Sequence, residues 1–293
     1  MSVDANVRPA AAGMRRNLRA ASLGFAAFAV FSGTDALVKL LAVRLAVPQV
    51  TFMVTLAAMI SLSARAGIKG AGASLMPRHP GLALLRALLL AIDTLLIYYA
   101  LSLLPLAEAY LLAFLTPMLV AVLAFLLLAE RLSPLAWSGV VIGFLGVAIA
   151  LRPGIAPLNI GHANAAASAL VFALSLLLLR RAKATESDLA LVFTLLVVLT
   201  VVALGVAVVG GGLAPVGPMD LFVAFAAGLL LLAGHLLLVR AFRMGDASVV
   251  APFQYSQIIW GCLYGALFFS APIELHTLAG ALVIVLSGWL VLK

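Results

Sequence analysis

The sequence predicts an all-α polytopic membrane protein of ten transmembrane helices, arranged as two inverted five-helix repeats. Hydrophobic residues make up 66% of the 293 residues and charged residues only 10%, and the mean hydropathy is +1.26. The apolar residues form continuous runs, which excludes the alternating pattern of a membrane β-barrel. The chain also repeats itself at an offset of about 141 residues.

Ten apolar runs are long enough to cross a bilayer, and prolines and glycines separate most of them. The connecting loops are short, which predicts a compact bundle. The predicted spans are residues 18–43, 48–65, 81–103, 105–128, 134–151, 161–180, 188–209, 219–242, 247–269 and 273–292.

The basic residues predict the orientation. With the N-terminus inside, all of the 18 lysines and arginines except Lys39, Arg44 and Arg152 fall on the inner side. We therefore expect a bacterial-type inner (plasma) membrane protein with both termini in the cytoplasm. The net charge of +8 follows from this bias, so nucleic acid is not an expected partner. The Ala-rich residues 1–17 are predicted to be a disordered cytoplasmic segment.

The internal repeat pairs the ends of the two halves. Residues 130–143 (ERLSPLAWSGVVIG) align with residues 271–284 (APIELHTLAGALVI), so that Gly139 meets Gly280. Each repeat holds five spans, an odd number, and the two repeats must therefore have opposite orientations in the membrane. Inverted repeats are typical of secondary transporters, whose substrate site lies near the midplane between the repeats.

These features resemble the EamA family of the drug/metabolite transporter superfamily. The Trp-Gly…Lys pattern of the family's first helix corresponds to Phe31-Ser32…Lys39 in this sequence. The family also has a helix with a proline, then an acid, then a glycine-rich helix. These correspond to Pro117, Glu130 and residues 139–146. In the second unit Ala271 stands where the acid is expected, and Glu274 follows three residues later.

The resemblance covers nearly the whole chain. It implies one EamA-like repeat over residues 18–152, a periplasmic linker over 153–160 and a second repeat over 161–293. It also implies export of amino acids, other metabolites or drugs, with amino-acid exporters as the nearest match.

The ninth span has a polar middle, which marks the strongest candidate for a substrate site. Gln254, Tyr255, Gln257 and Trp260 lie within an uncharged run, where lipid offers no hydrogen-bond partners. Gln254 and Gln257 share a helix face, and Pro252 interrupts the helix just before them. We interpret the cluster as a cavity wall. The alternative is a helix–helix interface joined by amides.

Charged residues inside the spans are the next candidates. Asp93, near the centre of the third span, is predicted to bind a substrate amine or a proton, or else to form a structural pair. Asp35 and Lys39 are spaced i, i+4 and can pair with each other or bind substrate. Tyr99 is a candidate for stacking on a substrate, with an interface belt as its alternative. Glu108 is expected to be a hydrated residue near the outer end of its span.

Three residues are candidates for coupling or hinge motion. His235, in the inner half of the eighth span, is a candidate proton carrier, and a hydrogen-bonded structural role is its alternative. Pro117 and Pro252 are candidate hinges because proline leaves a helical carbonyl without its donor. The histidines lack metal spacing and the chain lacks a phosphate-binding loop motif, so no metal and no cofactor are expected.

The resulting hypothesis is a secondary-active or facilitative transporter. It would export small metabolites, most favourably neutral or aromatic amino acids, by alternating access. A drug or cationic-compound exporter is the alternative within the same family. A channel or an integral-membrane enzyme are the alternatives of another class, although the enzyme motif H-E-x-x-H is absent from the sequence. The expected partners are a small-molecule substrate and the lipid bilayer, and the chain is expected to be a monomer or a homodimer.

Overall fold

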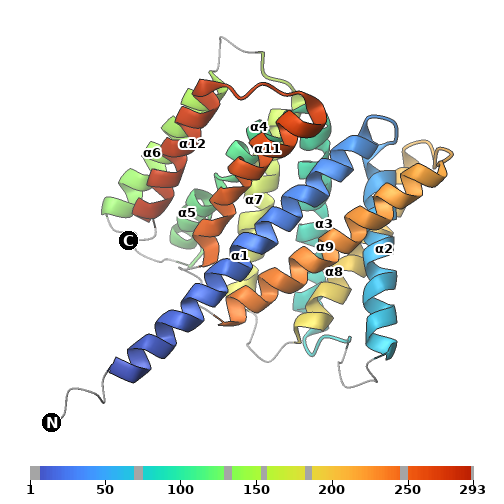
Figure 1. The fold of residues 1–293 in the computed structure, drawn as a ribbon, viewed down its shortest axis with the longest axis horizontal. Helices are drawn as coiled ribbons and strands as arrows, with labels where there is room; N and C mark the ends of the chain where they lie inside the picture. The colour runs from blue at the N-terminus through green and yellow to red at the C-terminus, as the bar shows by residue number, and fades with distance from the viewer. Residues whose placement is uncertain are drawn as a thin grey trace.

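The computed structural model describes residues 7–68, 75–128, 134–152, 157–181, 187–244 and 250–291, and these residues form helices joined by short loops (Figure 1). The helices are α1 (Val7–Ala42), α2 (Val47–Ile68), α3 (Pro80–Leu103), α4 (Leu106–Ala113), α5 (Thr116–Leu128), α6 (Pro134–Leu151), α7 (Ile160–Arg181), α8 (Asp188–Val209), α9 (Pro218–Met244), the 3₁₀ helix η1 (Ala251–Ser256), α11 (Gln257–Phe269) and α12 (Leu275–Val291).

The predicted fold class is confirmed. Among the described residues, seven helical stretches are long and apolar enough to cross a membrane, and α4 and α5 together form one of them. Two shorter apolar helical stretches, Trp137–Leu151 of α6 and Leu275–Ser287 of α12, accompany them. With the combined stretch of η1 and α11, the helices correspond to the ten predicted spans.

One boundary differs from the prediction. Residues 1–17 were expected to be disordered, but α1 begins at Val7. This early part of the helix, residues 7–17, contains three alanines and three arginines, and both residue types have a high helix propensity. The segment continues the first span beyond its predicted start (Figure 1).

Two of the predicted continuous spans are broken in the middle. The fourth span divides into α4 and α5 at Phe114 and Leu115, and the ninth divides into η1 and α11. In the fourth span Pro117 has no N–H to offer the carbonyl of Ala113, which is the last residue of α4. The repeat offset of 141 residues places Phe114 opposite Tyr255 and the start of α5 opposite the start of α11. The two breaks therefore occupy equivalent positions in the two repeats.

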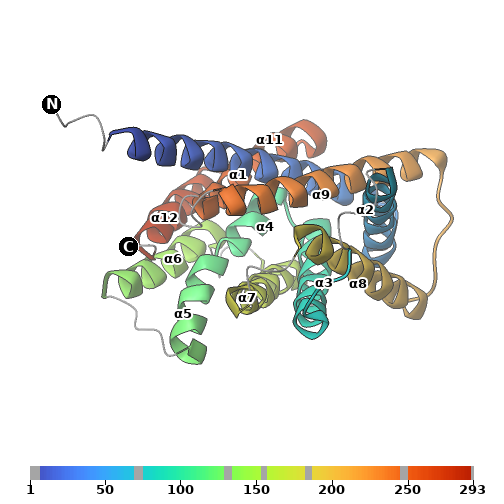
Figure 2. The same ribbon diagram turned by 90° about the horizontal axis from the view of Figure 1, so that it is seen from below.

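The packing has the two-fold pattern expected of an inverted repeat. α1 packs along α9 and α3 packs along α7, and these two pairs are equivalent when the repeats are exchanged. In the same way, α2 with α9 corresponds to α8 with α3. α1 and α9 lie together on one face of the molecule in both views (Figures 1 and 2). α4 of the fourth span also packs on α11 of the ninth span, which brings the two broken spans together.

Small residues allow α6 and α12, another repeat-related pair, to approach closely. A methyl group built on Gly280 would lie 2.5 Å from the Cβ atom of Ala150 and 2.7 Å from the carbonyl oxygen of Gly146. One built on Gly146 would lie 2.8 Å from the side chain of Ile284. The close contact of these glycines therefore lies inside the bundle, between the two repeats.

Candidate functional site

The junction between the two broken spans is lined by aromatic side chains. The ring of Phe114, at the end of α4, meets the ring of Tyr255 edge to face at a centroid distance of 5.1 Å. One turn away, Tyr110 packs so closely on Gly261 of α11 that a Cβ atom there would lie 2.8 Å from its ring. Only glycine lets α4 and α11 approach to this distance, so the sequence at this position sets the separation of the two repeats.

Three polar atoms near this junction are buried without a partner. Tyr255 Oη, Ser256 Oγ and Trp260 Nε1 make no hydrogen bond within the described part of the chain. A buried polar group left unpaired costs about 1–3 kcal/mol, so such groups mark either bound water or a ligand site. Gln254, in η1, is half-buried and Gln257, the first residue of α11, is buried. Pro252 is the second residue of η1 and Pro117 the second of α5, so both prolines lie at helix starts.

Asp35 does not pair with Lys39. The ion pair that their i, i+4 spacing allowed is therefore wrong. The Asp35 carboxylate instead accepts a hydrogen bond of 2.8 Å from the Tyr110 hydroxyl of α4. Lys39 Nζ donates to the backbone carbonyls of Leu101 and Leu104 at 2.6 and 2.7 Å. It also lies 5.4 Å from the centre of the Phe269 ring. Carbonyls at a helix C-terminus have no partner within the helix and carry negative partial charge, so they attract the ammonium group.

Asp93 lies in the same region of the bundle. Its carboxylate accepts a hydrogen bond of 2.6 Å from Ser168 of α7. It lies within electrostatic range of Asp35, and the buried Tyr98 lies within the electrostatic range of both. Neither carboxylate has an ion-pair partner among the described residues. The structure therefore places two of the predicted site residues, both acids, within electrostatic range of each other.

Tyr99, the candidate for stacking on a substrate, is exposed on the surface of α3, whereas the adjacent Tyr98 is buried. The exposure of Tyr99 agrees with its alternative, a place in the interface belt. The sequence does not reveal this difference between neighbours, because it depends on which face of α3 meets α7.

His235 lies apart from the acids. Its ring meets Phe31 of α1 edge to face at a centroid distance of 5.0 Å. Arg86 of α3 lies near enough to interact with it electrostatically, and the Arg86 Nε atom is buried without a hydrogen-bond partner among the described residues. The imidazole therefore faces an aromatic ring and a cation.

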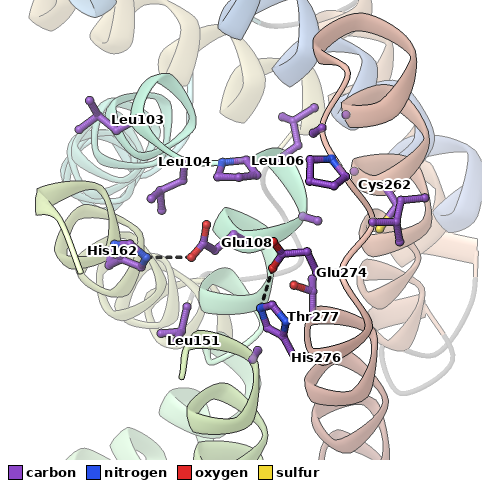
Figure 3. A pocket seen from close by; sticks show the side chains of 18 of the residues that line it. Leu103, Leu104, Leu106, Glu108, Leu151, His162, Cys262, Glu274, His276 and Thr277 are labelled. Atoms are coloured by element: carbon purple, nitrogen blue, oxygen red, sulfur yellow. Dashed lines mark hydrogen bonds and ion pairs between the residues drawn. The ribbon is translucent and has the colours of Figure 1, made fainter. Parts of the chain in front are cut away.

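A pocket of about 300 Å³ opens at the end of the bundle where α3, α6 and α11 end and α4, α7 and α12 begin (Figure 3). Its walls combine apolar side chains, such as those of Leu103, Leu106 and Leu151, with a similar share of polar surface. Two carboxylate–histidine pairs also line it. The orientation predicted from the basic residues places this end on the outer side of the membrane.

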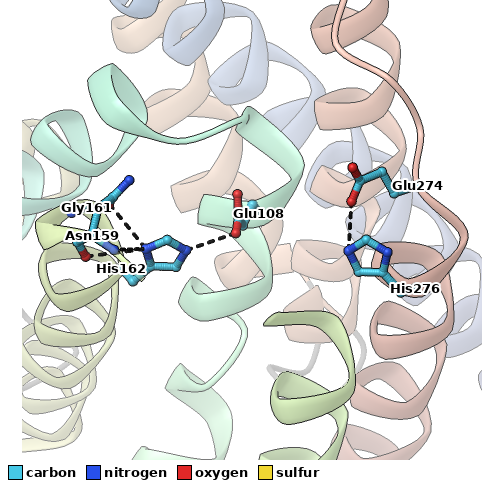
Figure 4. Close-up of polar contacts among 6 residues, drawn as sticks. All are labelled: Glu108, Asn159, Gly161, His162, Glu274 and His276. Atoms are coloured by element: carbon cyan, nitrogen blue, oxygen red, sulfur yellow. Dashed lines mark hydrogen bonds and ion pairs between the residues drawn. The ribbon is translucent and has the colours of Figure 1, made fainter. Parts of the chain in front are cut away.

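The first pair joins α7 to α4 (Figure 4). His162 Nδ1 lies 3.0 Å from the backbone nitrogen of Asn159 and 3.2–3.3 Å from its side-chain and backbone oxygens. His162 Nε2 lies 2.9 Å from Glu108 Oε1. The Asn159 side chain in turn accepts from the N–H of Gly161 at 2.8 Å, which fixes the turn before α7.

The second pair is local. His276 Nε2 lies 2.7 Å from Glu274 Oε2, at the start of α12. Neither pair was predicted from the sequence as a unit. Glu108 was expected to be a single hydrated residue, and its partner His162 lies on another span. In the described part of the chain no three histidine, cysteine or acidic side chains are arranged to hold a metal ion.

The chain matches the sequence model of the EamA-like transporter family twice, over residues 18–152 and 159–293. An S-adenosylmethionine uptake transporter of Rickettsia felis is 29% identical to it over 72% of this chain and 71% of that protein. The pseudopaline exporter CntI of Pseudomonas aeruginosa is 26% identical over 88% and 90%. A riboflavin transporter of Rhizobium johnstonii is 29% identical over 72% and 70%.

A solved crystal structure shares the fold, with a TM-score of 0.66 at 20% identity, over 92% of this chain and 95% of the other. The relatives are transporters and exporters of small metabolites rather than enzymes. The two matches to one family model cover almost all of the sequence and agree with the two-fold packing of the helices. The chain is therefore a multi-pass membrane transporter that belongs to the EamA-like transporter family.

Proposed function

We propose that this protein transports small metabolites that carry a protonated amine, most favourably neutral or aromatic amino acids. The observation that carries the proposal is the pair of carboxylates Asp35 and Asp93. Each is hydrogen-bonded to a hydroxyl and neither is paired with a cation among the described residues. Two neighbouring carboxylates repel each other in a medium of low dielectric constant, and a substrate ammonium group placed between them would relieve that repulsion.

The unpaired polar atoms at the α4–α11 junction support the same proposal. Tyr255 Oη, Ser256 Oγ and Trp260 Nε1 offer hydrogen bonds that no described residue takes up. Trp260 stacks between Phe25 and Tyr264, at centroid distances of 5.5 and 6.2 Å. Such a surface suits the flat or apolar side chain of an aromatic amino acid.

The architecture and the family support an alternating-access mechanism. The substrate groups named above come from both repeats, with Asp35 and Asp93 on the first and Tyr255 and Trp260 on the second. Rocking of one repeat against the other would expose such a site alternately to the two sides. We propose export across a bacterial-type inner membrane. The named relatives include both uptake transporters and an exporter, so direction needs its own measurement.

A drug or cationic-compound exporter is the second candidate. The same two acids would bind such a cation. Lys39 is already bound to the carbonyls of α3, and no other described cation lies beside Asp35. A substrate carboxylate would then have no partner in the site. A cation without a carboxylate would bind equally well.

Flux into liposomes that contain the purified protein tests both candidates. Labelled phenylalanine should enter saturably, and phenethylamine, which keeps the amine, should compete with it. The competitor 3-phenylpropionate, which keeps only the carboxylate, should not. Asp93→Asn should reduce the flux about tenfold or more, the effect of losing one charge-assisted hydrogen bond. The matched control is Asp188→Asn, the same change at the first residue of α8.

Each outcome separates the alternatives. Saturable flux of phenethylamine without flux of phenylalanine would favour the cationic-compound exporter. Flux that does not saturate would favour a channel. Competition by 3-phenylpropionate as strong as that by phenethylamine would refute recognition through the amine. Repeating the assay with a pH gradient tests proton coupling, and His235→Asn then tests the role of that histidine.

A further inference from the structure

The pocket at the end of the bundle is separate from the acids deeper in the protein. Ala107 and Gly261 line it, and directly below them Tyr110 packs against Gly261. Tyr110 donates its hydroxyl proton to Asp35, and neither Tyr110 nor the two acids Asp35 and Asp93 are among the residues that line the pocket. The pocket is therefore a site distinct from these acids.

Two carboxylates face this compartment from different repeats (Figure 3). Glu108 uses Oε1 for the contact with His162, and Glu274 uses Oε2 for the contact with His276. Within the described residues the second oxygen of each carboxylate has no partner. The Glu108 side chain is 28% exposed and that of Glu274 is 51% exposed, so both can reach a molecule in the pocket.

The charged groups that face the pocket are acidic. Glu108 and Glu274 line it together with their histidine partners, His162 and His276. Among the described residues that line the pocket there is no lysine or arginine. The acids therefore favour a cation in a chamber whose walls are partly apolar and partly polar.

We propose that this pocket is a second binding site, an outer vestibule that takes small organic cations with an ammonium group and an apolar body. The ammonium group would bind the free oxygens of Glu108 or Glu274, and the apolar body would contact the leucine-rich walls. The inference rests on the proposed function, because the ligands are of the same class as the proposed substrates. A ligand can nevertheless bind at the vestibule without being transported, so an experiment can refute the vestibule and leave the proposed transport intact, or the reverse.

Cys262 provides the test, because it is the one cysteine in the sequence and it lines the pocket. The purified full-length protein in nanodiscs is treated with two methanethiosulfonates, one cationic (trimethylammonium) and one anionic (sulfonate), at low salt. Each rate is divided by the rate of the same reagent with a free thiol in solution. A negative chamber should favour the cation about tenfold in this normalised ratio. The preference should shrink in about 0.5 M salt, which screens charges.

Variants assign the preference to the two acids. We expect the normalised ratio to fall about tenfold in E108Q/E274Q and by an intermediate factor in E274Q alone, which changes the more exposed acid. Asp188→Asn is the matched control and should leave the ratio unchanged. Phenethylamine should slow the modification of Cys262 in the unaltered protein, whereas 2-phenylethanol should not. Cys262→Ser gives the background.

Two results would overturn the inference. A normalised ratio near one that does not respond to the Glu→Gln changes would mean that the pocket does not attract cations. Failure of both reagents to modify Cys262 in folded protein would mean that molecules of this size do not enter it. Neither result involves flux. If the vestibule did not exist but the proposed central site worked, Cys262 modification would give one of these results while phenylalanine transport stayed normal.

Discussion

Replacing Lys39 with methionine should destabilise the protein strongly, because its ammonium group satisfies two backbone carbonyls at the end of α3. Leu101 and Leu104 are almost completely buried, so water cannot take over their carbonyls. Loss of a hydrogen bond to a charged group costs about 1.5–3 kcal/mol, and the contact with the Phe269 ring adds about 0.5–1 kcal/mol. Since Lys39 is only half-buried, we expect a loss of about 3 kcal/mol for Lys39→Met.

The measurement is unfolding of the purified protein in mixed micelles with increasing dodecyl sulfate. Arg44→Met is the matched control, since Arg44 lies a few residues away but is 70% exposed and reaches Asp220 only at 3.5 Å. Such a surface pair contributes about 0–1 kcal/mol. If Lys39→Met were no less stable than Arg44→Met, the assignment of Lys39 as the cap of α3 would be refuted.

The same variant tests the alternative that Lys39 binds a substrate carboxylate. A cap holds α1 and α3 together for every substrate, so its loss should change the flux of phenylalanine and of phenethylamine by the same factor. A ligand for the carboxylate would affect phenylalanine alone. Half-saturation concentrations of the two compounds, measured in the same liposomes, separate these roles.

Three further changes test the buried contacts. Tyr110→Phe removes the hydroxyl that orients Asp35 but keeps the size of the side chain. It should lower the initial rate of phenylalanine flux about tenfold. An unchanged rate would argue against Asp35 as a substrate ligand. Ser168→Ala should have a similar effect, measured in the same assay, because its hydroxyl lies 2.6 Å from the second carboxylate. Gly280→Ala should cost about 1–3 kcal/mol in the micelle unfolding assay, since its methyl group would overlap α6, whereas Gly81→Ala has open space around it and should be neutral or slightly stabilising. Equal stability of the two alanine variants would contradict the close α6–α12 packing.

The fold class and the span count were predictable because they depend on local properties. A run of apolar residues predicts a membrane helix without knowledge of its neighbours, since the bilayer acts on each segment separately. The break after Ala113 was also partly readable, because Pro117 removes one donor from its own helix. The odd number of spans per repeat then required the inversion, which the paired packing of α1 with α9 and of α3 with α7 bears out.

The partners of the polar side chains were decided only by the tertiary structure. The i, i+4 spacing of Asp35 and Lys39 allowed an ion pair, yet Tyr110 and the carbonyls of α3 lie closer to their polar atoms in the packed bundle. Glu108 and His162 lie 54 residues apart, and only the meeting of α4 with α7 brings them together. Hydropathy and helical periodicity act along one segment, whereas a hydrogen bond between helices depends on their rotation and separation. The sequence by itself therefore determined a ten-span inverted-repeat membrane protein, and the packing of its helices decided which acids remain free to meet a substrate.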